Sequence, residues 1–297
     1  MYYTKTLSGK IFNALNTLLM LSIAFICVAP ILHVLLASIS DPALLMRHKG
    51  IVLWPLGAPT LKGYEKVFQN ENIIRGYLNT LFYVSAGTGL NMILTIMGGY
   101  ALSRKNLLWK NLVVFLIVFT MWFSGGLIPT YMLVYKIGLI DTRSAVILPT
   151  AVSAFNMIIM RTGFSGIHES IEEAAKIDGA GDFTTLFRIM IPLNKAVIAV
   201  ITLFYLVFNW NQWFNSLIYL PNRRDLYPLQ LILREILIKN DMSSMMSAEA
   251  GRTNDQDLYR QLVKYSTIIV ATLPILCIYP FVQKYFVKGF MIGSVKG

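Results

Sequence analysis

Few side chains in this sequence have the types and spacing that bond-making chemistry requires. Its three histidines, His33, His48 and His168, are too few and too scattered for a metal cluster. The sequence has no Ser/His/Asp arrangement, no H-E-x-x-H pattern and no G-x-x-x-x-G-K-[ST] phosphate-binding loop. We therefore expect no catalytic residue, no metal and no cofactor in this chain.

Amide and aromatic side chains gather where they could bind a sugar. Segment 209–219 holds three asparagines, a glutamine, two tryptophans and a tyrosine. Amides offer donors and acceptors to hydroxyl groups, and indole faces offer platforms for sugar rings. The same residues would also suit an aromatic belt at a membrane interface and hydrogen bonds between helices. The residues expected to line a sugar path are Asn209, Trp210, Asn211, Trp213, Asn156 and Tyr205.

The polar stretch 169–195 lies between apolar segments and predicts a helix, a turn and a second helix. Ser170 and Glu173 have the S-x-x-E spacing of a capping box, which predicts that the first helix begins there. Gly179 and Gly181 can take positive φ and end that helix. Small residues on it would allow close approach to another protein, although the pattern also fits an ordinary connector.

The second helix of this stretch is expected to carry one apolar stripe. Asp182 can cap its beginning. Phe183, Leu186, Phe187 and Met190 follow at i, i+3, i+4 and i+7. A proline at position 192 should then close the helix.

The elements that must position these residues are membrane helices. Of the 297 residues, 56% are hydrophobic and 14% are charged, with a mean hydropathy of +0.59. No soluble domain of ordinary size fits between the apolar runs, so we expect a single all-α integral membrane domain over residues 1–297. The six runs that can cross a bilayer lie near residues 11–39, 77–101, 111–135, 144–162, 196–220 and 265–283.

These runs carry few polar or helix-breaking residues. None has Asp, Glu, Lys or Arg at its middle, which argues against an ion-coupled carrier. Gly125, Gly126 and Pro129 predict a break in the third run, where the chain either lines a cavity or packs closely. His33 fits a packed, hydrogen-bonded residue better than a proton relay.

The distribution of charge suggests which side of the membrane each loop faces. Basic residues near both ends and in loop 102–110 place the termini in the cytoplasm. The net charge of +11 is spread over loops without a basic-aromatic block, so we expect no nucleic acid partner. Loops 40–76 and 221–264 then face outward.

One pattern in the polar stretch resembles a known family. Residues 173–175 read Glu-Ala-Ala, residues 178–180 read Asp-Gly-Ala, and Phe187, Ile189 and Pro192 follow. This resembles the EAA loop of binding-protein-dependent ABC importers, in its carbohydrate branch. The likeness extends to segments 209–213 and 288–293, and is closest to the second permease of maltose-type and complex-polysaccharide importers. By this resemblance, the residues coupled to an ATPase are Glu173, Ala174, Ala175, Asp178, Gly179 and Ala180.

The resemblance implies a fold and a set of partners. It implies six transmembrane helices in a prokaryotic inner membrane and a cytoplasmic coupling loop at 163–195. Its partners would be a second homologous permease, two cytoplasmic ABC ATPases that hold ATP and Mg²⁺, and an extracytoplasmic solute-binding protein. The lipid bilayer would surround the pair, and the cargo would be an oligosaccharide moved by alternating access.

Other functions stay open at this point. The chain could be an importer permease for a different small solute, since related importers carry amino acids, phosphate or metals. A stand-alone facilitator would need neither ATP nor a partner. A membrane-embedded transferase would need carboxylates or histidines beside a cleft, whereas the acidic residues cluster in the EAA loop.

Overall fold

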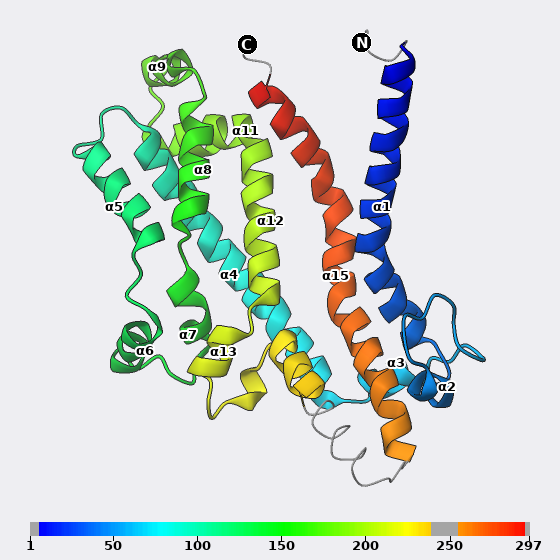
Figure 1. Cartoon of the computed structure of the whole chain (residues 1–297). Coiled ribbons are helices and arrows are strands. Elements are labelled where there is room, and N and C mark those ends of the chain that lie inside the picture. The colour runs from blue at the N-terminus through cyan, green and yellow to red at the C-terminus, as the bar shows by residue number, and fades with distance from the viewer. Residues whose placement is uncertain (1–5, 239–254, 295–297) are drawn as a thin grey trace. The chain divides into compact units, whose positions relative to one another are not determined.

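The computed structural model describes residues 6–238 and 255–294, and all regular elements within those ranges are helical (Figure 1). The chain divides into two compact units. Unit 1 comprises residues 1–71 and 233–273, and unit 2 comprises residues 72–232 and 274–297.

Three helices are long and apolar enough to span a membrane, and three bent pairs bring the number of candidate spans to as many as six. The prediction of an all-α membrane protein is confirmed. The long helices are α1 (Leu7–Ser38), α4 (Glu71–Ser103) and α15 (Asp255–Ser294). The bent pairs are α5 (Lys110–Trp122) with α6 (Leu127–Lys136), α7 and η1 (Arg143–Ile147, Leu148–Thr150) with α8 (Ala154–Ser165), and residues 182–193 with α12 (Lys195–Asn211).

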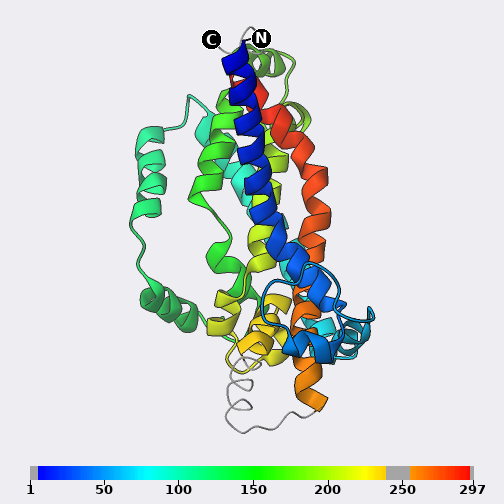
Figure 2. The ribbon, with the colours of Figure 1, turned by 45° about the vertical axis from the view of Figure 1, so that its right-hand side comes forward.

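The predicted break in the third run is confirmed. The chain bends by 112° between α5 and α6, across residues 123–126, which form no regular structure (Figure 2). Gly126 has a φ of +86°, which glycine adopts without steric cost. Pro129 lies in the first turn of α6, where its missing N–H is tolerated.

Two predicted boundaries differ from the structure. The fifth run was expected to continue to residue 220, but α12 ends at Asn211 because Gln212 is extended, and the short α13 (Phe214–Tyr219) follows. The last outward loop was expected to reach residue 264, but residues 229–238 are helical and α15 already begins at Asp255. Polar residues therefore extend the last helix well beyond its apolar part.

Unit 1 packs α1 against its own short helices and the start of α15. The short helices are α2 (Pro42–Arg47) and α3 (Lys62–Phe68), and the buried core is Ala37, Leu45, Val52 and Leu262. Nδ1 of His33 accepts a hydrogen bond from the Val52 N–H at 2.9 Å, and the ring meets Tyr265 edge-on. The interpretation of His33 as a packed, hydrogen-bonded residue is confirmed.

Unit 2 is built on α4, which carries a buried polar stripe that the sequence analysis did not recognise. Its members recur on one side of the helix and are Asn79, Thr80, Tyr83, Thr88, Asn91 and Thr95. Asn79 Nδ2 donates to the carbonyls of Asp225 and Tyr227, and Tyr83 donates to that of Leu226. The stripe therefore fixes the irregular segment after α13 to α4.

The middle of the stripe joins α4 to η1 and α12. Asn91 Nδ2 donates to the carbonyls of Thr150 and Ala151, both at 2.8 Å. Asn209 Nδ2 donates to Asn91 Oδ1 and to Thr88 Oγ1, both at 3.1 Å. These bonds satisfy backbone groups that the break before α8 leaves free, which lipid could not do.

Replacing Asn91 by leucine should destabilise the protein. Two buried carbonyls and the Asn209 amide would lose partners, which should lower the free energy of unfolding by about 2 kcal/mol. We expect a fall of about 5 °C in the melting temperature of the detergent-solubilised protein. The control is Asn211→Leu, because Asn211 is exposed and its side chain bonds, among the residues that the structure describes, only to Val207 of its own helix. Equal effects of the two changes would contradict the role given to Asn91.

Candidate coupling segment and membrane cavity

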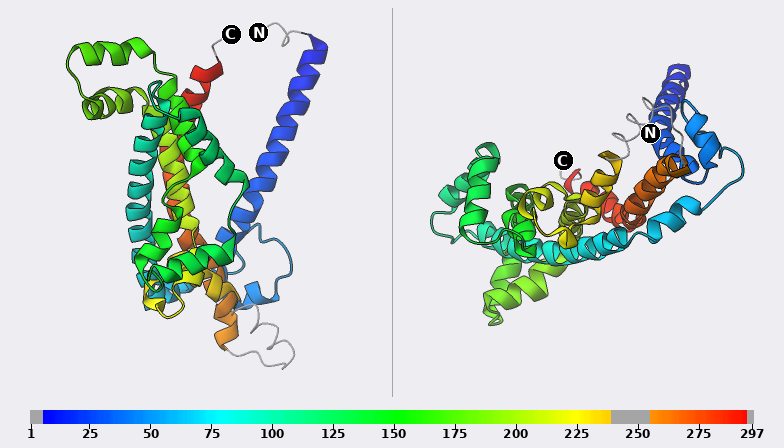
Figure 3. Two further views of the ribbon diagram at one scale, coloured as in Figure 1. Left: turned by 90° about the vertical axis from the view of Figure 1, so that its left-hand side faces the viewer. Right: turned by 90° about the horizontal axis from the view of Figure 1, so that it is seen from below.

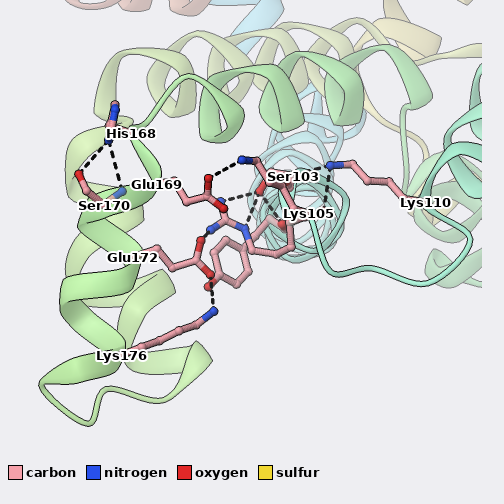
Figure 4. Close-up of polar contacts among 10 residues, drawn as sticks. Ser103, Lys105, Lys110, His168, Glu169, Ser170, Glu172 and Lys176 are labelled. Atoms are coloured by element: carbon pink, nitrogen blue, oxygen red, sulfur yellow. Dashed lines mark hydrogen bonds and ion pairs between the residues drawn. The ribbon is translucent and has the colours of Figure 1, made fainter.

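Helix α9 (Glu169–Ile177) begins before the predicted capping box. Its N-cap is His168, whose Nδ1 accepts a hydrogen bond from the Ser170 N–H at 3.3 Å. The Ser170 hydroxyl lies 2.8 Å from the same nitrogen (Figure 4). The prediction that Ser170 caps the helix was wrong, because Ser170 already lies inside it and the preceding histidine has the extended backbone of a cap.

The turn that ends α9 follows the prediction at one glycine and not at the other. Gly179 has a φ of +78°. Its N–H bonds to the Lys176 carbonyl, and the Ala180 N–H bonds to the Ala175 carbonyl, which is the Schellman pattern. Gly181 has a φ of −73° and needs no glycine for its conformation.

The second helix is not a single regular stripe. It consists of α10 (Asp182–Thr184), a π-helix, η2 (Thr185–Met190), and α11 (Ile191–Leu193). Gly181, not Asp182, is its N-cap. The wider π-helical turn coincides with a proline at 192, which cannot donate to the carbonyl four residues earlier.

The π-helix splits the predicted apolar stripe in two. Leu186 and Met190 are buried in a core with residues of α4, α8 and α12. Phe183 and Phe187 are instead exposed, at 68% and 58%. The stripe prediction was therefore wrong for these two phenylalanines: each pair of residues four apart shares a side, but the π-helical stretch places the Leu186–Met190 pair and the Phe183–Phe187 pair on different sides.

The coupling residues indicated by resemblance lie on a segment that projects from unit 2 (Figure 3). Glu173, Ala174, Asp178 and Gly179 are exposed, and Ala180 is half-buried. Ala175 is the exception, since it is buried against the rest of the chain.

Exposed apolar side chains accompany them, and their exposure was not foreseen from the sequence. They are Ile171, Ile177, Phe183 and Phe187, with Ile177 85% exposed. The signal available in the sequence was the occurrence of two isoleucines, Ile171 and Ile177, on a helix rich in charged residues.

Ion pairs connect α9 to the end of α4 (Figure 4). Arg104 pairs with Glu172, and Lys105 pairs with Glu169. The hydrogen bond from Lys105 is the main reason that the pKa of Glu169 lies below its usual value. These pairs were not foreseen from the sequence, where the basic residues of loop 102–110 indicated only the orientation of the chain.

A cavity of about 560 Å³ lies within unit 2, between α12 and the break before α8. Its lining residues are Pro149, Thr150, Val152, Ser153, Phe155, Asn156, Phe204, Tyr205 and Phe208. The structure thus brings the predicted pair Asn156 and Tyr205 into one cavity. The Tyr205 hydroxyl lies 2.7 Å from Thr95 Oγ1 and accepts from the Ser153 N–H at 3.3 Å.

The side-chain amide of Asn156 is available for hydrogen bonds to a ligand in this cavity. The side chain is only 6% exposed, yet its carboxamide makes no hydrogen bond to any residue that the structure describes. Buried amides in proteins normally have partners. A ligand with hydroxyl groups would supply one.

The other four predicted path residues do not line this cavity. Asn209 is bonded to the α4 stripe, and Trp210 is buried with its ring edge-on to Tyr77. Asn211 is exposed, and Trp213 meets its neighbour Phe214 edge-on.

The family model described as "Binding-protein-dependent transport system inner membrane component" matches residues 6–292 of this chain. The chain belongs to this family. It is similar to the polygalacturonan/rhamnogalacturonan transport system permease protein YtcP of Bacillus subtilis (40% identical, covering 98% of this chain and 100% of the relative). It is also similar to protein LplC of the same organism (38%, covering 98% and 97%).

A solved structure resembles this permease component closely. It is a chain of a bacterial ABC transporter involved in the import of the acidic polysaccharide alginate, with 31% identity and a TM-score of 0.84. The match covers 95% of this chain and 98% of that one. The family resemblance found in the EAA loop, the transport role and the inner-membrane location are confirmed.

Gly179→Ala should loosen the end of α9 in this permease component. A non-glycine residue in the left-handed region costs about 1 kcal/mol, although no atom lies near enough to clash with the added methyl group. Amide hydrogen exchange of residues 175–180 should speed up about fivefold. Gly181→Ala is the control, since that site has equal space and a negative φ. Unchanged exchange in Gly179→Ala would contradict the assignment.

Proposed function

We propose that this chain is a permease subunit of an ATP-driven ABC importer for acidic oligosaccharides. The observation that carries the substrate class is the agreement of two relatives over nearly the whole chain. One is named for polygalacturonan and rhamnogalacturonan, and the other belongs to an importer of the acidic polysaccharide alginate. Both names describe polymers that contain uronic acids.

The working unit in this proposal pairs the chain with a second homologous permease over two cytoplasmic ABC ATPases, which hold ATP and Mg²⁺. An extracytoplasmic solute-binding protein delivers the sugar to loops 40–76 and 221–264, of which residues 239–254 lie outside the described residues. Both termini and α9 face the cytoplasm. Closure of the ATPases moves α9 and switches the path from inward-open to outward-open.

The exposed side of α9 supports its role as the docking element. Glu173, Ala174, Asp178 and Gly179 are accessible, and Ile177 adds an apolar group that its own chain leaves uncovered. Burying Ile177 in a groove of the ATPase would contribute to affinity through the hydrophobic effect. Ala175 and Ala180 serve by holding the turn close to unit 2.

The cavity supports contact with sugar. Asn156 has an unused amide, Ser153 and Tyr205 add hydroxyls, and Phe155, Phe204 and Phe208 provide apolar faces. Rings of sugars present both hydroxyl edges and apolar faces, so this mixture suits them. Asn209, Trp210, Asn211 and Trp213 remain in the proposal as the continuation of the path along α12 and beyond.

Affinity purification in mild detergent, followed by mass spectrometry, tests the assembly. The wild-type chain should bring down an ABC ATPase and a second permease. Glu173→Lys should lose the ATPase, because Glu173 is exposed and makes no ion pair within the described chain. The control is Lys136→Glu, an exposed charge reversal at the end of α6. A chain that purifies alone and moves solute without ATP would instead be a facilitator.

Uptake assays test the cargo and the cavity. Uronate-containing oligosaccharides should compete for uptake, and neutral oligosaccharides of equal length should not. Asn156→Leu should lower uptake about tenfold, the size of one lost amide–hydroxyl contact. Thr162→Val is the control, because Thr162 lies on the exposed side of the same helix. Strict preference for neutral sugars would remove the acidic substrate, and equal uptake by the two variants would remove the cavity.

A further inference from the structure

We propose that the Arg104–Glu172 ion pair is the mechanical link through which α9 moves the α4 span, with Arg104 as its positioning residue. The inference rests on the proposed coupling function of α9. It concerns how a displacement of α9 reaches the membrane, which the family match does not assign to any residue.

The pair is shielded from water more than its neighbours are. The Arg104 and Glu172 side chains are 19% and 13% exposed, whereas Lys105 and Glu169 are 76% and 47% exposed. A shielded pair is screened less by solvent and salt, so it resists separation more strongly than an exposed one.

Both partners are held in place by further contacts. The Arg104 guanidinium lies 4.6 Å from the centre of the Tyr100 ring and donates twice to Ser103 Oγ. Glu172 also forms an ion pair with Lys176, one turn further along α9, with 3.0 Å between Lys176 Nζ and Glu172 Oε1. The charges therefore sit in fixed positions, and little conformational freedom is lost when they pair.

The end of α4 is itself tied to two other helices. Lys110, at the start of α5, donates to the carbonyls of Ser103 and Arg104 at 3.2 and 2.9 Å. Arg161 of α8 donates to the Leu102 carbonyl at 3.2 Å. A displacement delivered to Arg104 is thereby passed to α4, α5 and α8 together.

Few other contacts attach α9 to the rest of unit 2 as the structure describes it. Ala175 is the only buried residue of α9, and its other connections within the described chain are the exposed Lys105–Glu169 pair and the backbone turns at its two ends. Because backbone turns bend easily and an exposed pair is weak, α9 would slide past α4 if the Arg104–Glu172 pair were absent. The Arg104–Glu172 pair therefore makes the attachment of α9 to the end of α4 stiff.

Lys105–Glu169 provides a matched control on the same two segments. It joins the residue after Arg104 to a residue three before Glu172, with the same charges and the same direction. Its exposure predicts a small effect. Any result that depends only on net charge near α9 would affect both pairs equally.

The experiment uses the complete reconstituted transporter and three readouts: recovery of the ATPase subunits, ATP hydrolysis, and sugar transported per ATP. R104E and E172R should each keep the ATPase bound and ATP hydrolysis active, while transport per ATP falls about tenfold. The double swap R104E/E172R should restore transport per ATP to within about threefold of wild type. K105E, E169K and their double swap should each change it less than about twofold.

The possible failures are distinguishable. If the wild-type chain recovers no ATPase, the proposed function fails. If the ATPase binds and R104E transports as much per ATP as K105E, the link is overturned. Loss that the double swap does not restore would also overturn it, since that would indicate a local folding role. Should the reversed variants not accumulate, R104Q and E172Q, compared with K105Q, give the same test without added repulsion.

Discussion

The constraint on which unit 2 depends is that polar groups inside a bilayer must find partners within the protein. Its spans are broken, and each break frees carbonyls that lipid cannot satisfy. The stripe on α4 provides donors for two irregular segments: Asn79 for the segment after α13 and Asn91 for the break before α8. Asn209 of α12 in turn donates to Asn91. The irregular backbone, and the cavity beside it, are possible because side chains of α4 donate hydrogen bonds to the freed carbonyls.

Tyr205 of α12 connects the cavity to the stripe, which makes the two physically dependent. Tyr205 lines the cavity with its ring, and its hydroxyl lies against Thr95 of the stripe. A movement of α4 therefore changes the wall of the cavity. The ion pairs after the end of α4 are therefore connected to the cavity through a single helix.

Sequence reasoning found what local chemistry determines. The positive φ at Gly179, the break at Gly126 and the packed His33 each follow from one residue type and its neighbours. It missed what distant partners determine. The residues around Asn209 do not indicate that its amide donates hydrogen bonds to residues about 120 positions earlier in the chain. Nor do the residues around Glu172 indicate its ion pair with Arg104. The π-helix was also not predicted, because the spacing of apolar residues in this segment fits a regular α-helix equally well.

The order in which the α4 stripe acquires its partners has a consequence for synthesis. A ribosome makes α4 before the carbonyls of residues 150 and 151, before Asn209, and long before the segment at 225–229. The newly inserted helix therefore waits with a row of unpaired polar groups. Its residence in the bilayer during that interval depends on water, on insertion machinery or on a neighbouring chain, and α4 has the lowest hydropathy of the three long helices.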